Sequence, residues 1–114
     1  SPMWMPDSQH LIVSVDRFDA TQLLLTDRDG AWPVALTNDK KGDAWDARPA
    51  PDGRKIAYVH RPFDDLNRLD IRLINLEDGQ IRTLVGTPQE KNHTPRWSPD
   101  AKFLAYLSQR TGFF

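Results

Sequence analysis

Short apolar runs recur along the chain, and each follows a Pro-Asp dipeptide. The runs occupy 11–15, 56–59 and 103–107, and most neighbouring positions within them are apolar rather than alternating with polar residues. A strand with one face in water alternates, whereas a strand covered on both faces is apolar throughout. Proline and glycine interrupt the chain too often for a helical stripe to develop. The pattern therefore predicts three copies of a tight turn that leads into a buried strand.

The spacing of the turns indicates a repeat protein. The Pro-Asp dipeptides begin at positions 6, 51 and 99, so the periods are 45 (51 − 6) and 48 (99 − 51). Asp-Gly dipeptides, which favour hairpins because glycine accepts a positive φ, end at positions 30 and 79, a spacing of 49 (79 − 30). Such periods are typical of a propeller blade. We expect an all-β fold, a β-propeller fragment of about two and a half four-stranded antiparallel blades.

These marks divide a single partial propeller domain, 1–114, into three blades. Blade one is expected at 1–44, with strands near 2–5, 10–15, 22–27 and 32–37. Blade two is expected at 45–94, with strands near 47–50, 55–60, 70–76 and 80–85. Blade three, at 95–114, is incomplete and holds strands near 95–98 and 103–108. The fourth strands alternate between apolar and polar residues, as expected of outer strands.

The third copy carries the fullest motif, Trp97-Ser98-Pro99-Asp100-Ala101-Lys102 followed by Leu104-Ala105-Tyr106. This motif resembles the β-propeller repeat of TolB and of the N-terminal domains of the prolyl oligopeptidase family. Asp100 is expected to accept hydrogen bonds from its own turn. The glycine that is usual after the aspartate is present at Gly53, but Ser8 and Ala101 replace it in the other copies. We therefore expect those two turns to be of type I, without a positive φ.

The resemblance implies a function for the parent protein. The stretches 60–65 and 70–76 are similar to blades of acylaminoacyl-peptidase and dipeptidyl-peptidase-like members of that family. The first hypothesis is a non-catalytic propeller segment of a prolyl-oligopeptidase-like serine peptidase. In that family the propeller gates access to the active site and positions short peptides. The resemblance places the catalytic Ser, Asp and His on an α/β-hydrolase domain, outside this chain.

Two alternatives stay open, since fold does not settle function. One is a TolB-like protein-binding propeller with no attached enzyme. The other is a carbohydrate-active propeller similar to oligogalacturonate lyase, which would require a metal-binding histidine constellation. A Gly-x-Ser-x-Gly motif beyond position 114 would favour the peptidase.

Charge and composition argue against several classes of partner. The chain has 15 Lys and Arg against 16 Asp and Glu, a formal net charge of −1, which gives no long-range field for nucleic acid. No apolar run approaches the roughly 20 residues of a membrane-spanning helix, and no signal peptide is visible. We expect a soluble chain, cytoplasmic or periplasmic, with no membrane contact. The absence of cysteine excludes disulfides and thiolate metal sites.

No motif predicts catalysis, a cofactor or a metal in this segment. Gly-x-Ser-x-Gly is absent among its serines. The three histidines occupy different points of the blade pattern: His10 opens a second strand, His60 closes one, and His93 falls in an inter-blade loop. A metal site requires convergent ligands, so none is expected.

The four tryptophans fall into two pairs. Trp4 and Trp97 occupy the repeat position, and inter-blade packing is the expectation for both. Trp32 and Trp45 do not align with it, so they are either ordinary packing residues or a platform for a sugar or peptide.

The long connections are the expected site of binding. In an up-and-down blade the second-to-third loop and the linker to the next blade emerge on one face, opposite the tight turns, and binding residues concentrate on long loops. The expected partners are the remaining blades, an α/β-hydrolase domain, and short peptides or a protein. The fragment is also expected to self-associate. The candidate contact residues are Asp43, Asp46, Arg61, Asp64, Asp65, Arg68 and His93.

Overall fold

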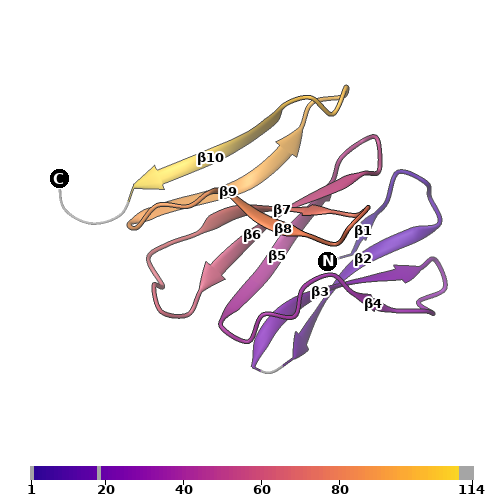
Figure 1. Ribbon diagram of the computed structural model, residues 1–114, viewed down its shortest axis with the longest axis horizontal. Helices are drawn as coiled ribbons and strands as arrows, with labels where there is room; N and C mark the ends of the chain where they lie inside the picture. Colours follow the sequence, from indigo (N-terminus) through magenta and orange to yellow (C-terminus); the bar gives the residue numbers. More distant parts are fainter. Residues whose placement is uncertain (1, 18, 111–114) are drawn as a thin grey trace.

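The computed structural model describes residues 2–17 and 19–110, which form three antiparallel sheets (Figure 1). The first sheet contains β1 (Met3–Trp4), β2 (His10–Arg17), β3 (Ala20–Asp27) and β4 (Val34–Ala35). The second contains β5 (Gly42–Pro49), β6 (Lys55–Pro62), β7 (Asp70–Asn75) and β8 (Ile81–Val85). The third contains β9 (Glu90–Trp97) and β10 (Leu104–Arg110). Strands follow one another in sequence order in each sheet, which confirms the predicted all-β blades.

The first strands of the second and third sheets begin earlier than expected. The expected blade divisions, 44/45 and 94/95, fall inside β5 and β9. The starts of both strands are polar or small, Gly-Asp-Ala and Glu-Lys-Asn, so no apolar run announces them. Consequently Asp43, Asp46 and His93 are strand residues, and the expectation that His93 lies in an inter-blade loop was wrong.

The three Pro-Asp turns share one geometry, which corrects the expectation for two of them. Ser8 and Ala101 have φ of 58° and 63°, close to the 74° of Gly53. In each turn the aspartate accepts a hydrogen bond from the N–H two residues later, and in the third Asp100 Oδ1 lies 3.0 Å from Lys102 N and 2.6 Å from Ser98 Oγ. These hydrogen bonds hold a left-handed residue that would otherwise favour glycine.

The core lies between the first and second sheets. Ile12 and Leu23 from the first sheet are buried against Ala44, Ile56 and Tyr58 from the second. All of β6 from residue 56 to 60 is buried, as its apolar run predicted. In β2 and β10 the same kind of run is partly or largely exposed among the described residues, and Phe103 and Leu107 are 71% and 58% exposed.

Trp4 and Trp97 occupy the same repeat position but differ in their surroundings. Trp97 donates its indole N–H to the carbonyl oxygen of Arg48, 2.8 Å away on β5, so it joins the second and third sheets as expected. Trp4 occupies the matching place in the first sheet and is 54% exposed. Trp32, with a positive φ, is 84% exposed in the β3–β4 turn. Neither exposed ring is part of the described core.

The long connections gather at one end of the sheets, and the tight turns lie at the other (Figure 1). The linker 36–41, the β6–β7 loop 63–69 and the linker 86–89 make up this long-loop face. Backbone hydrogen bonds fasten it: Phe63 N donates to Lys41 O at 2.8 Å, and Leu69 N donates to Glu90 O at 3.1 Å. The β6–β7 loop is therefore tied to both neighbouring segments.

Candidate functional site

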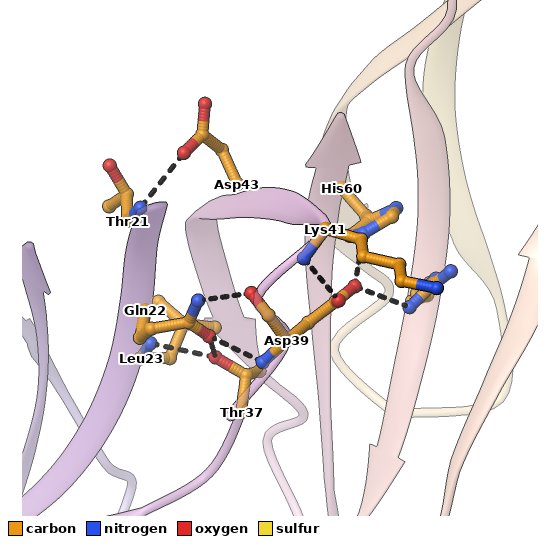
Figure 2. Close-up of polar contacts among 9 residues, drawn as sticks. Thr21, Gln22, Leu23, Thr37, Asp39, Lys41, Asp43 and His60 are labelled. Atoms are coloured by element: carbon orange, nitrogen blue, oxygen red, sulfur yellow. Dashed lines mark hydrogen bonds and ion pairs between the residues drawn. The ribbon is translucent and has the colours of Figure 1, made fainter. Parts of the chain in front are cut away.

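A buried polar network joins the first sheet to the linker that leads into the second (Figure 2). Gln22, fully buried on β3, donates to Asp39 O at 2.6 Å and accepts from Asp39 N at 3.1 Å. Thr37 donates its hydroxyl to Gln22 Oε1 at 2.7 Å and accepts from Leu23 N at 3.0 Å. Because every partner is satisfied locally, the network fixes the path of the linker.

The Asp39 side chain extends that network to the second sheet. His60 Nε2 lies 2.9 Å from Asp39 Oδ2, and Lys41 N donates to Asp39 Oδ1 at 2.8 Å (Figure 2). Burial works to raise the pKa of Asp39, but the Lys41 N–H, His60 and Arg72 outweigh it and hold the pKa below its ordinary value. The carboxylate is therefore ionised and anchors the linker to β6.

His60 is the buried member of this pair, only 3% exposed. Burial, with the charge of Arg72, lowers the pKa of His60 and outweighs the opposing effects of Asp39 and Asp70. The ring is neutral at neutral pH, so we assign its proton to Nε2, which donates to Asp39. The other nitrogen, Nδ1, is buried with no partner among the described residues. The neutral form avoids burying an unpaired N–H there.

Two hollows flank Arg72, the first of them on the long-loop face. One has a volume of about 420 Å³, and its lining comprises Asp39, Lys40, Lys41, His60, Pro62, Phe63, Asp64 and Arg72. The other, of about 490 Å³, is lined by Thr37, Asn38, Asp39, Tyr58, Arg72, Ile81 and Thr83. Asp39 and Arg72 belong to both. The two hollows therefore adjoin at these residues, whose charged atoms lie 3.9 Å apart.

Two of the predicted contact residues form a pair. Arg61 Nη2 lies 2.8 Å from Asp43 Oδ2, and the two residues are opposite one another on β5 and β6. Asp43 Oδ1 also accepts from Thr21 N at 2.8 Å, which ties the pair to β3. The Arg61 guanidinium lies 5.6 Å from the ring centroid of Trp45. In this structure Trp45 therefore makes a cation–π contact with the Arg61 guanidinium.

Two others lie on the first strands of the sheets, away from that pair. Asp46, at φ 51°, sits in a β-bulge and pairs with Arg48 at 2.9 Å and with Arg96 of the third sheet at 3.7 Å. His93 lies on β9 opposite Leu107 and its Nδ1 is 2.7 Å from Thr94 Oγ1. Asp46 links two sheets rather than forming part of the long-loop face.

The remaining three belong to the β6–β7 loop. Asp65 accepts from Asn67 N at 3.3 Å, a contact within its own turn. Arg68 pairs with Asp70 at 2.8 Å, and that hydrogen bond raises the pKa of Arg68. Asp64 lines the hollow beside Lys41. The seven predicted residues thus fall into three separate groups and do not converge on one point.

The sequence reasoning missed Asp39, Lys41 and Arg72, and did not give His60 a partner. Arg72 carried a usable signal, because it is a charged residue between Ile71 and Leu73 in a predicted strand, and such a residue needs a partner when it is buried. Over 2–17 and 19–110, no three His, Asp or Glu side chains come together as metal ligands. The same residues contain no helix able to cross a membrane.

No protein-family model matches the chain. It is 36% identical over 107 residues to the Tol-Pal system protein TolB of Alcanivorax borkumensis, covering 90% of this chain and 23% of the relative. The β-propeller repeats of the chain thus resemble those of TolB. The fold agrees with a putative TolB from Agrobacterium tumefaciens, with a TM-score of 0.75 and 22% identity over 98% of this chain and 42% of that one.

Peptidases share the fold as well. Puromycin hydrolase matches with a TM-score of 0.76 and 21% identity, over 95% of this chain and 19% of that protein. At this level of identity the likeness concerns the fold alone. The propeller fold and the TolB-type resemblance are both confirmed, and the chain spans less than a quarter of the length of the TolB relative it matches.

Proposed function

We propose that this chain is a non-catalytic segment of a TolB-like, protein-binding β-propeller. The observation that carries the proposal is the 36% identity to a Tol-Pal system protein over 107 residues, since the likenesses to peptidases are weaker in sequence. The second candidate, a propeller that gates a serine peptidase and positions short peptides, is supported by the TM-score of 0.76 with puromycin hydrolase.

No observation favours the carbohydrate-active alternative. It would require a histidine metal site, whereas His10, His60 and His93 lie on three different strands. Each has a non-metal partner in its own neighbourhood, which is Asp7, Asp39 or Thr94.

The long-loop face suits protein binding because it carries exposed charged residues beside exposed Phe63 and Leu66, and backbone hydrogen bonds fasten it. A scaffold of buried strands fixes its loops, and recognition residues concentrate on such loops. Of the predicted contacts, we propose Arg61, Asp64 and Arg68 as direct ones. Asp43 would position Arg61 through the 2.8 Å ion pair. Asp46, Asp65 and His93 remain proposals, and their side chains have local partners.

Two assays on the full-length protein that contains this chain separate the two candidates. Isothermal titration with the Pal protein of the same genome tests the Tol-Pal role, and a fluorophosphonate probe with a fluorogenic aminoacyl substrate tests the peptidase role. We expect saturable binding to Pal, with no labelling and no turnover. Labelling of a serine, turnover that survives purification and no binding to Pal would reverse the ranking.

A further inference from the structure

Three cationic side chains, Lys40, Lys41 and Arg72, line the 420 Å³ hollow on the long-loop face. Lys40 and Lys41 are exposed on the linker, and Arg72 rises from the neighbouring strand β7 with its side chain 27% exposed. Two carboxylates, Asp39 and Asp64, also line it. The hollow therefore brings together cations from the linker and from β7. Whether it can bind an anion depends on how far the two carboxylates neutralise these cations.

The carboxylate of Asp39 already has hydrogen-bond partners. Asp39 Oδ2 is taken by His60 at 2.9 Å, and its Oδ1 by the Lys41 N–H at 2.8 Å. Asp64 lies near Arg68, whose ion-pair partner is Asp70 at 2.8 Å. The three cations that line the hollow outnumber its two carboxylates.

Arg72 is only partly paired by the groups around it. Its Nη1 lies 3.9 Å from Asp39 Oδ2, beyond hydrogen-bond range. Its Nε is buried without a partner among the described residues, and Tyr58 is its other polar neighbour. A partly buried guanidinium in this condition gains from an oxyanion, which accepts two hydrogen bonds in parallel from it.

The apolar side of the hollow indicates what else the ligand contains. Pro62 and Phe63 also line the hollow, and Phe63 is 38% exposed. A free inorganic anion would leave this surface in water. A peptide that carries an acidic residue beside an apolar one would cover the aromatic ring and meet the cations at the same time.

We propose that this hollow binds an acidic segment of a protein partner, with a carboxylate over Arg72 and Lys41 and an apolar side chain against Phe63. The inference rests on the proposed protein-binding function for the identity of the ligand as a polypeptide. Lys40 adds to the attraction, and the second hollow beyond Arg72 gives the segment room to continue.

The test uses the full-length protein and a fluorescein-labelled hexapeptide, Glu-Phe-Glu-Glu-Phe-Glu, in fluorescence polarisation. A matched peptide with Gln in place of each Glu serves as the uncharged control, and inorganic phosphate as a competitor. We expect the acidic peptide to bind at least about tenfold more tightly than the Gln peptide. Added NaCl should weaken the binding of the acidic peptide, because salt screens the attraction between exposed charges.

Charge-reversal variants locate the site. Lys41→Glu should lower the affinity for the acidic peptide by about tenfold. Lys102→Glu, an equal charge change at the tight-turn end, should leave this affinity unchanged. Lys41 contributes only its backbone N–H to the Asp39 network, so the variant should keep the wild-type melting temperature.

Three outcomes would overturn the inference: equal binding of both peptides, an equal loss in Lys102→Glu, or phosphate that binds as tightly as the acidic peptide. The result is distinguishable from failure of the proposed function. Binding of the acidic peptide without binding to Pal refutes only the Tol-Pal role. Binding to Pal without discrimination between the peptides refutes only this site.

Discussion

Trp97 and Arg48, from neighbouring sheets, are joined by a hydrogen bond of 2.8 Å between the indole nitrogen and the backbone carbonyl oxygen. The ring lies at the end of β9, and the acceptor belongs to β5, so the bond fixes how the third sheet rests on the second. Trp97 also opens the motif that ends in the Asp100 turn. The repeat signature therefore contains both the turn and the contact that seats one blade on its neighbour.

Replacing Trp97 by phenylalanine should destabilise the chain by about 1 kcal/mol or more, because the carbonyl loses its donor and some buried area is lost. Urea unfolding monitored by far-UV circular dichroism measures this change. Trp32→Phe is the matched control, since that ring is 84% exposed and should tolerate the same replacement. Equal effects of the two substitutions would show that the inter-sheet bond contributes nothing.

Glycine at position 101 should stabilise the third turn. Ala101 has a φ of 63°, a conformation that costs a residue with a Cβ about 1–2 kcal/mol. Ala101→Gly removes that cost and adds some chain entropy to the unfolded state, so we expect a gain of up to about 1 kcal/mol. Ala105→Gly, in a strand with no such φ, should be destabilising. Thermal unfolding of both variants tests the sign.

Acidification should lower the folding stability of the chain because His60 becomes protonated. The folded state lowers the pKa of His60, so the unfolded state binds the proton first, and stability is full above the ordinary value of 6.5 and falls as pH drops below it. Asp39, Arg72 and Asp70 are the charged groups that act on the ring. The lowered pKa of Asp39 adds a second loss below its ordinary 3.8.

Melting temperatures between pH 7.5 and pH 5 reveal the His60 effect, in the range about its ordinary pKa. In His60→Gln the amide keeps a donor for Asp39 and does not titrate, so the slope over this interval should flatten. His93→Asn is a matched histidine replacement on another strand. A slope that survives in His60→Gln would contradict the assignment.

Position 42 should tolerate no side chain. A Cβ on Gly42 would overlap His60 Nε2 and lie 2.8 Å from the carbonyl oxygen of Arg61. Gly42→Ala should therefore cost about 1–3 kcal/mol through overpacking. A double-mutant cycle with His60→Ala separates the ring from the backbone, and the alanine should cost less once the ring is absent. Simple additivity would mean that the ring is not the obstacle.

The isolated 114-residue chain should self-associate. Phe103 and Leu107 on the third sheet and Trp4 on the first are 71%, 58% and 54% exposed, an amount of apolar surface that monomeric proteins seldom leave in water. Light scattering after size exclusion should give a mass above 13.1 kDa. Leu107→Glu with Phe103→Glu should lower it. A wild-type monomer that unfolds cooperatively would contradict this prediction.

Much of the fold was readable from the sequence because tight turns and buried strands leave local marks. Gly53 and the apolar residues of β6 act through their immediate neighbours, so spacing alone reveals them. The polar first strands left no such mark, and β5 and β9 were placed too late. The turns at Ser8 and Ala101 were misjudged because the aspartate, rather than glycine, holds their conformation.

The candidate site was less accessible to sequence reasoning. Asp39 and His60 are separated by 21 positions, one on the linker before β5 and the other on β6, and only the folded path of that linker brings them together. Asp43 and Arg61 were both selected as loop residues, yet they meet because β5 and β6 align them. Which long-loop residues share a hollow depends on register, and the repeat spacing does not specify register.

The shared geometry of the three Pro-Asp turns also bears on how such repeats diverge. A turn whose left-handed residue is held by an aspartate carboxylate survives the loss of glycine at a cost of about 1–2 kcal/mol. Duplicated copies can then drift at that position while the following strand keeps its register. All three copies keep the aspartate, but only one keeps the glycine. A sequence search that requires the glycine would therefore miss two of the three copies.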